Sequence, residues 1–280
     1  MIDQEPDTSN QQGGALSASA RLKLNWVPWT TQQAFRGVLF TLIPWIGFNM
    51  LLNALGKNAA PPTKPISFSD DLAGIFSTII LTLLIEGAFL IAPFIYANRT
   101  LALDLLREGE TRLRAAGRYL GLRRFQLLRT LPWIVGLMVL IIGADSLYSW
   151  VVNALHLNLQ TNDQLVQQYS VYEPLTTYAL LAGSVFIAPF CEELFFRGFV
   201  FAGLLRELSP LWAVIVSAGL FAVAHADPGS FVPLFLIGLG LGFLRWRTGS
   251  TWASMSLHIL NNLVASVDII LSMHHIFLPF

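Results

Sequence analysis

Long runs of apolar residues, separated by short polar segments, dominate the sequence from about residue 37 onward. A helix needs about 20 mostly apolar residues to cross the roughly 30 Å hydrocarbon core of a bilayer. Runs that approach or exceed this length lie at about residues 37–55, 72–96, 131–152, 174–206, 210–226, 230–246 and 250–273. The pattern predicts an all-α fold, a polytopic membrane bundle of about seven, or eight, transmembrane helices.

The composition agrees with a membrane protein, because 54% of the residues are hydrophobic and only 12% are charged. Soluble domains carry about twice that charged fraction. The formal net charge is +0, so no overall field favours nucleic acid, and the single Cys191 excludes an intrachain disulfide framework. We therefore expect the lipid bilayer as the surrounding medium, and neither nucleic acid nor nucleotide as a partner.

Three parts of the chain differ in character. Residues 1–33 begin with a polar stretch that lacks a secretory signal, and we interpret them as a disordered cytoplasmic tail. Residues 34–173 contain the first membrane helices and a basic linker at 97–130, which is expected to include an amphipathic helix against anionic headgroups or to serve only as a topology signal. Residues 174–273 form a second group of spans.

The distribution of basic residues predicts the orientation. The 97–130 linker is rich in arginine, whereas the segment 153–173 has neither Lys nor Arg. Basic loops stay on the cytoplasmic side of an inserting membrane. The N-terminus and the linker are therefore expected inside, with 153–173 and the C-terminal end outside.

Ionisable residues within apolar spans are functional candidates, because each costs several kcal/mol unless it is paired or hydrated. Those that qualify are Glu86, Asp145, Glu192, Glu193, Arg197, His225, His258 and Asp268. For Glu86, Asp145 and Asp268 no neighbour in the sequence suggests a chemical task, and we expect them to be interhelical hydrogen-bond partners.

The remaining polar residues come at helical spacings. Glu193 and Arg197 are four residues apart, the interval of an intrahelical ion pair. Glu192 points about 100° away from Glu193 and has no such partner, which makes it the better candidate for a general base. The same interval of four joins Phe221 to His225 and His258 to Asn262.

The depths of these residues also agree. Glu192 and His225 lie at similar distances on either side of the "LSP" turn at 208–210, so an antiparallel hairpin places them at one level. His258 follows its own turn near Thr248 by about ten residues, or some 15 Å of helix, which gives a comparable depth. We expect Glu192, His225, His258 and Asn262 to converge on one water-accessible cavity.

Three motifs in this order resemble the CAAX protease and bacteriocin-processing family, which includes the type II CAAX prenyl endopeptidases. They are "EELFFR" at 192–197, "FAVAH" at 221–225 and "HILNN" at 258–262. The resemblance covers about residues 174–270 and implies an intramembrane endopeptidase that acts on a membrane-associated protein or peptide. It also suggests the inner membrane of a bacterium as the location.

The resemblance implies a role for each residue. Glu192 and His225 would activate water as the general base, and His258 and Asn262 would donate hydrogen bonds to the oxyanion. Glu193, Arg197 and Phe221 would be structural or positioning residues.

Two questions remain open from the sequence. A divalent metal such as zinc, held by Glu192, His225 and His258, is compatible with the motifs but not required by them. A non-proteolytic membrane scaffold or regulator of the same family is the alternative function. A transporter is less favoured, because no inverted repeat is evident.

Overall fold

The computed structural model describes residues 27–56, 64, 66–101, 106–159, 161–170 and 172–274. Every regular element in these ranges is helical, which confirms the all-α fold. The elements before the long central segment are α2 (Thr31–Gly56), α3 (Phe68–Thr100), α4 (Arg112–Tyr119), α5 (Leu127–Ala154) and α6 (Asn162–Ser170). Those after it are α10 (Pro210–Ala224), α11 (Phe231–Thr248) and α12 (Thr251–Met273).

The central segment is one long helix interrupted by two π-helical stretches. It consists of α7 (Pro174–Ala182), η2 (Gly183–Ile187), α8 (Ala188–Glu193), η3 (Leu194–Val200) and α9 (Phe201–Leu204). Such π-helical turns are rare and often occur at functional sites. Here they lie on both sides of the two adjacent glutamates.

Five helical segments within the described residues are long and apolar enough to cross a membrane: Phe68–Thr100, Leu127–Ala154, Pro174–Leu204, Phe231–Thr248 and Thr251–Met273. The shorter α10 is also apolar. All seven predicted spans coincide with helices, since α2 and α10 supply the other two. The polytopic bundle predicted from the hydrophobic pattern is therefore confirmed.

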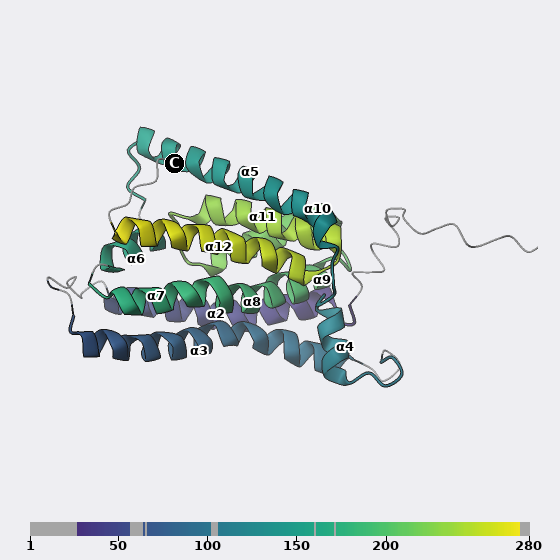
Figure 1. Ribbon diagram of the computed structural model, residues 1–280. Coiled ribbons are helices and arrows are strands. Elements are labelled where there is room, and N and C mark those ends of the chain that lie inside the picture. The colour runs from purple at the N-terminus through teal and green to yellow at the C-terminus, as the bar shows by residue number, and fades with distance from the viewer. Residues whose placement is uncertain are drawn as a thin grey trace, which may run out of the picture.

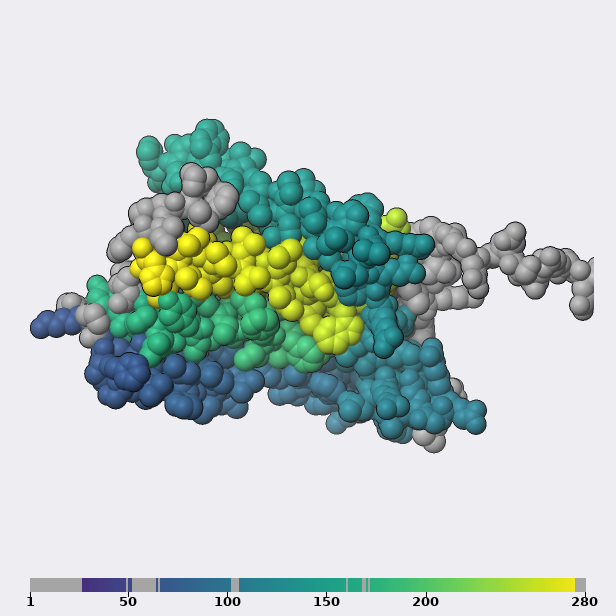
Figure 2. Space-filling model, in the orientation of Figure 1, coloured from purple at the N-terminus to yellow at the C-terminus, as the bar shows by residue number. Residues whose placement is uncertain are grey.

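The long helices lie side by side in one bundle, with α4 at one end and α6 at the other (Figure 1). On the face seen in Figure 2, α12 lies between α5 on one side and the α7–α8 segment on the other. The described residues of the 97–130 linker and the turn after α9 are at the end that carries α4, opposite to α6. This arrangement separates the basic linker from the 153–173 segment, as the charge pattern predicts.

The outer faces of α3 and α5 are apolar and exposed. Only 11% of the most apolar window of α3 and 22% of that of α5 are buried, and side chains such as Leu84 and Leu140 point outward. Large exposed apolar faces are rare on soluble monomers. They match the hydrocarbon interior of a bilayer, where helices satisfy their own backbone hydrogen bonds.

A buried aspartate joins the start of α3 to the start of α7. The Asp71 carboxylate accepts hydrogen bonds from the backbone N–H groups of Leu175 and Thr176, both at 2.9 Å, and from the Thr176 hydroxyl at 2.8 Å. The first turn of a helix has N–H groups without intrahelical partners, and a carboxylate stabilises them. This contact fixes α3 and α7 in a parallel arrangement.

Small residues bring α10 and α11 close together. A Cβ atom at Gly238 would lie 3.0 Å from the Ala218 Cα, and one at Gly242 would lie 3.2 Å from Val214. Glycines four residues apart allow this close approach between membrane helices. The approach leaves the Gly238 backbone carbonyl within reach of the central segment.

The basic linker packs against the bundle end. In α4, Arg112 and Arg114 are exposed while Ala115 and Ala116 are buried in the hydrophobic core, so this helix is amphipathic. Its predicted contact with anionic headgroups stays a prediction. Arg118 pairs with Glu110 at 2.8 Å and lowers the pKa of the Glu110 carboxyl to about 2. The pair therefore stays charged at physiological pH.

The N-terminal tail, predicted to reach residue 33, ends earlier in the structure. Residues 1–26 lie outside the described residues, but Trp29 is buried and its Nε1–H donates to the Phe199 carbonyl at 3.0 Å. Thr31 already begins α2 and donates to the Gly203 carbonyl at 2.9 Å. The boundary drawn at residue 33 is thus too late, because an aromatic anchor precedes the first apolar run.

The contact between the linker and α12 at Gly121 is expected to contribute to the stability of the fold. This residue has φ +79°, its carbonyl accepts from the Thr251 N–H at 2.8 Å, and an added Cβ would lie 2.6 Å from the Thr251 Oγ1. Gly109 has φ +70° but nothing within 4 Å of an added Cβ. Both alanine variants incur the left-handed penalty of about 1–2 kcal/mol, and we expect Gly121→Ala to lose about 1–3 kcal/mol more through overpacking. Thermal melting in detergent would compare them, and equal melting temperatures would contradict the docked linker.

Candidate active site

The central segment positions the first motif at the interior of the bundle. Glu192 and Glu193 end α8, and Arg197 lies in η3. All three are buried, with Glu193 and Arg197 0% exposed and Glu192 8% exposed. Three ionisable side chains at this depth need strong partners, because burial of an unpaired charge is costly.

Glu193 and Arg197 form the predicted ion pair, with the Arg197 Nη1 donating to the Glu193 Oε1 at 2.8 Å. The Arg197 Nη2 also donates to the Gly238 carbonyl at 3.2 Å, and the guanidinium lies 4.4 Å from the centre of the Phe221 ring. A carboxylate, a carbonyl and an aromatic face thus surround the guanidinium. Arginine suits such a site because its planar fork contacts several partners at once.

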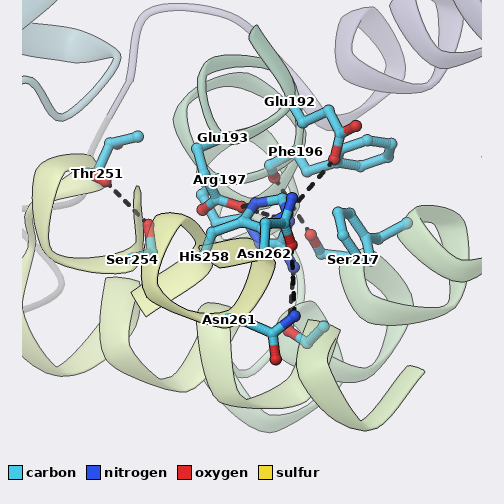
Figure 3. Close-up of polar contacts among 12 residues, drawn as sticks. Glu192, Glu193, Phe196, Arg197, Ser217, Thr251, Ser254, His258, Asn261 and Asn262 are labelled. Carbon is cyan, nitrogen blue, oxygen red and sulfur yellow. Dashed lines mark hydrogen bonds and ion pairs between the residues drawn. The ribbon is translucent and has the colours of Figure 1, made fainter. Parts of the chain in front are cut away.

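His258 lies between the two glutamates (Figure 3). Its Nδ1 is 3.2 Å from the Glu193 Oε1, and its Nε2 is 3.9 Å from the Glu192 Oε2. An ionised carboxylate only accepts hydrogen bonds, so we assign the Nδ1 hydrogen to the bond with Glu193. The Nε2 edge of the imidazole then faces Glu192.

Glu192 has a carboxylate oxygen without a hydrogen-bond partner in the described part of the chain. Its Oε2 is buried and accepts no hydrogen bond from the described residues. The 3.9 Å to the His258 Nε2 is too long for a direct hydrogen bond, but one water molecule can contact both atoms. As the spacing predicts, Glu193 forms the ion pair with Arg197 and Glu192 does not. The different roles assigned to the two glutamates stay a prediction.

Phe221 connects the second motif to this group. Its ring centre is 4.6 Å from that of His225 and 5.5 Å from that of His258, and it also packs edge-on against Phe196. The His225 Nδ1 is 2.8 Å from the Phe221 carbonyl. A carbonyl oxygen only accepts, so Nδ1 carries the hydrogen and the Nε2 of a neutral His225 is an acceptor.

His225 and Glu192 each have another polar neighbour. Among the described residues, no hydrogen bond or ion pair joins them, and the imidazole next to Glu192 is that of His258. The number of residues on either side of the turn predicts that Glu192 and His225 lie at a similar depth. It does not predict which imidazole faces the Glu192 carboxylate. The joint action of Glu192 and His225 on water therefore stays a prediction.

Asn262 connects α12 to the first π-helical stretch. Its Nδ2 donates to the Ser184 carbonyl at 2.8 Å, and its Oδ1 accepts from the Asn261 Nδ2 at 3.3 Å. The carboxamide is thus already hydrogen-bonded. A role as oxyanion donor stays a prediction, and it requires the bond to Ser184 to be exchanged for one to substrate.

The residues suggested as metal ligands do not form a metal site. Among the described residues, no group of three or more His, Cys, Asp or Glu side chains is arranged to hold a metal ion. Glu192 and His258 approach each other, with 3.9 Å between Oε2 and Nε2. Because no third such side chain is arranged with them in this described part of the chain, the residues do not fit the suggested zinc set.

Two contributions to the site were missed in the sequence. The Gly238 carbonyl binds Arg197, and the Ser217 hydroxyl donates to the Phe196 carbonyl at 3.2 Å in η3. The glycines of the "GLGLG" run at 238–242 were the available signal for the first, because small residues mark close helix contacts. Ser217 carries no comparable signal.

Comparison with known proteins agrees with the motifs. Residues 174–264 match the family model described as "Type II CAAX prenyl endopeptidase Rce1-like". The resemblance predicted from the three motifs is therefore confirmed over this part of the chain. No solved structure gives a significant match.

Two curated relatives were found. An uncharacterized protein of Mycoplasma capricolum is 30% identical over 144 residues, which are 46% of this chain and 41% of that protein. The "Putative membrane peptidase YdiL" of Bacillus subtilis is 28% identical over 79 residues, 28% of this chain and 32% of that protein. The chain therefore spans less than half the length of the relatives it matches. With the apolar helices, these matches support an integral membrane protein whose residues 174–264 are similar to the CAAX prenyl endopeptidase family.

Proposed function

We propose that this protein is an intramembrane endopeptidase that hydrolyses a peptide bond of a membrane-associated protein or peptide. The observation that carries the proposal is the buried series Arg197, Glu193, His258 and Glu192, which ends in a carboxylate oxygen without a hydrogen bond. A charged series of this kind inside an apolar bundle is costly unless it serves chemistry. The family match over residues 174–264 supports peptide hydrolysis as that chemistry.

In the proposed reaction Glu192 is the general base. It takes a proton from a water molecule while the water oxygen forms a bond to the peptide carbonyl carbon. The carbonyl oxygen becomes an oxyanion. When the C–N bond breaks, the proton passes from Glu192 to the leaving amine nitrogen, so the carboxylate is restored at the end of the cycle.

The two histidines fit different roles. In the proposed reaction His258 donates from Nδ1 to the Glu193 carboxylate and from Nε2 to the oxyanion, with Asn262 as a second donor to the oxyanion. His225 donates its Nδ1 hydrogen to a backbone carbonyl, which leaves Nε2 as an acceptor for the water. Glu193 and Arg197 hold His258 in place, and Phe221 packs between the two imidazoles.

The location of the site supports a membrane-associated substrate. Glu192 and His258 are buried among helices whose outer surfaces are apolar, which favours a segment that is itself held in or at the membrane. The family description adds a prenylated C-terminal peptide as one candidate.

Membrane sidedness is a further part of the proposal, with the N-terminus and the linker in the cytoplasm of a bacterial inner membrane. In a Cys191→Ser background, we expect Asn158→Cys to react with a membrane-impermeant maleimide in intact cells whose outer membrane is permeabilised. Gln126→Cys should react only after the inner membrane is opened. Both positions are exposed, so access depends on the side of the membrane. The reverse labelling pattern would contradict the orientation.

Profiling of peptide termini tests the function in the cell. Membranes from cells that produce the wild-type protein are compared with membranes that contain equal amounts of Glu192→Gln. We expect at least one membrane protein to show a new terminus with the wild type alone. Identical termini in both samples would count against a protease.

A non-proteolytic scaffold or regulator is the second candidate function. It is favoured by the Asn262 carboxamide, which is bound to the Ser184 carbonyl, and by the lack of a direct bond between His225 and Glu192 within the described residues. A scaffold uses the buried ion pairs only for stability. Its cellular effect would therefore survive Glu192→Gln.

A further inference from the structure

Glu86 is an intramembrane carboxylate on α3 that belongs to none of the three motifs. The sequence predicts an interhelical hydrogen bond for it. Instead, its Oε2 is buried and accepts no hydrogen bond from the described residues. Glu192 is in the same condition, with a buried Oε2 that lacks a hydrogen bond. The Glu193 Oε2 is a third such oxygen among the described residues, but Glu193 is bound to Arg197 and His258 through its Oε1. Within the described ranges, Glu86 and Glu192 have no such ion pair with an arginine, and their unpartnered oxygens need an explanation.

The register between α3 and the central segment places Glu86 at the level of Glu192. The two segments run parallel, because Asp71 binds the start of α7 and Phe89 packs edge-on against Phe195 with ring centres 5.3 Å apart. Between these contacts, a Cβ atom at Gly183 would lie 3.0 Å from the Thr82 methyl group. Thr82 and Phe89 thus bracket Glu86, and Gly183 and Phe195 bracket Glu192.

Helical periodicity aims Glu86 at the central segment. Glu86 follows Thr82 by four residues and precedes Phe89 by three, so the three side chains share one face of α3. Thr82 and Phe89 both contact the central segment. The same face therefore presents the Glu86 carboxylate to α8.

The charges around the two carboxylates are defined. Glu86 interacts electrostatically with Glu192 and with Cys191. Glu192 also interacts with Glu193 and Arg197 of its own segment and lies near His258 of α12. The Arg197 guanidinium is hydrogen-bonded to Glu193, so its single charge is shared between Glu193 and Glu192. Like charges in a medium of low dielectric constant do not ionise independently.

We propose that Glu86 and Glu192 form a carboxylate pair that takes up and releases protons as one unit, with Glu86 as a positioning residue that sets how readily Glu192 accepts the proton of the attacking water. The inference rests on the proposed function. The water proton enters the pair at Glu192 and leaves from Glu192 to the amine nitrogen. The pair therefore begins and ends each cycle with the same number of protons.

Enzyme kinetics give the first test, with an internally quenched peptide that carries a farnesylated cysteine and purified protein in liposomes. In the wild type we expect the acidic limb of the kcat/KM profile to span two coupled protonation steps. Glu86→Gln should reduce the limb to a single step and lower kcat by about three- to tenfold. Glu86→Asp should keep the two steps. The control Asp145→Asn removes an exposed carboxylate from α5 and should change neither quantity.

Infrared titration gives a test that needs no cleavage. The C=O band of protonated carboxyl groups is followed against pH in the wild type, Glu86→Gln, Glu192→Gln and the double variant. We expect the sum of the titration curves of the two single variants to differ from the titration curve of the wild type. Each single variant loses one carboxyl group and also the interaction between the two groups. Additive titrations would overturn the inference, as would a Glu86→Gln enzyme with an unchanged pH profile. If the titrations couple but the wild-type protein cleaves no peptide, the pair stands and the proposed function fails.

Discussion

A Glu192→Gln variant is expected to lose at least about 100-fold in peptide cleavage, the usual contribution of a positioned general base. Glutamine keeps the size of the side chain but cannot accept the proton of the attacking water. The Glu192 Oε2 accepts no hydrogen bond from the described residues, so its replacement breaks no structural contact of that atom. The melting temperature in detergent should therefore stay close to that of the wild type.

The matched control for this change is Glu207→Gln. Glu207 is exposed near the end of the central segment, and its replacement removes the same charge. We expect full activity from this variant. A Glu192→Gln protein with wild-type cleavage would show that another group activates water.

Glu193→Gln is expected to destabilise the protein by about 3–5 kcal/mol, because it leaves a buried guanidinium without its carboxylate. Arg197 and Glu193 are both 0% exposed, and Glu193 also binds the His258 Nδ1. Activity should fall together with stability, since His258 loses the group that holds it. Thermal melting and the amount of folded protein in the membrane measure the first effect.

The double variant Glu193→Gln/Arg197→Met separates charge from packing. Removal of both charges avoids the unpaired guanidinium, so the double variant should melt at a higher temperature than Glu193→Gln alone. It should remain inactive, because His258 is still without its carboxylate. A stable, inactive Glu193→Gln together with an active Glu192→Gln would reverse the roles assigned to the two glutamates.

The sequence predicted those features that depend on spacing within one helix. The seven apolar runs coincide with helices in the structure, and Glu193 and Arg197, four residues apart, form a buried ion pair. Both follow from the geometry of the α-helix, which fixes length and side-chain direction. The three motifs were equally local, and they were sufficient to indicate the family that residues 174–264 match.

Features that depend on how helices pack were not predictable in the same way. The position of His258 between two carboxylates depends on the rotation of α12 about its axis, and the bond from Asn262 to Ser184 depends on a π-helical stretch. Glu86 is the clearest case. Glu86 lies at the level of Glu192 because of the contacts that Asp71 and Phe89 make with the central segment. The periodicity of the sequence does not predict these contacts.

Hydrolysis of a peptide by the purified protein in heavy-oxygen water tests the central claim most directly. The farnesylated reporter peptide and its unprenylated form are incubated with wild-type protein and with Glu192→Gln in liposomes, and the products are weighed by mass spectrometry. We expect two fragments with the wild type, one heavy oxygen in the new carboxylate, and intact peptide with Glu192→Gln. Equal cleavage by both proteins, or intact peptides with a wild-type protein whose cellular effect survives Glu192→Gln, would contradict the claim.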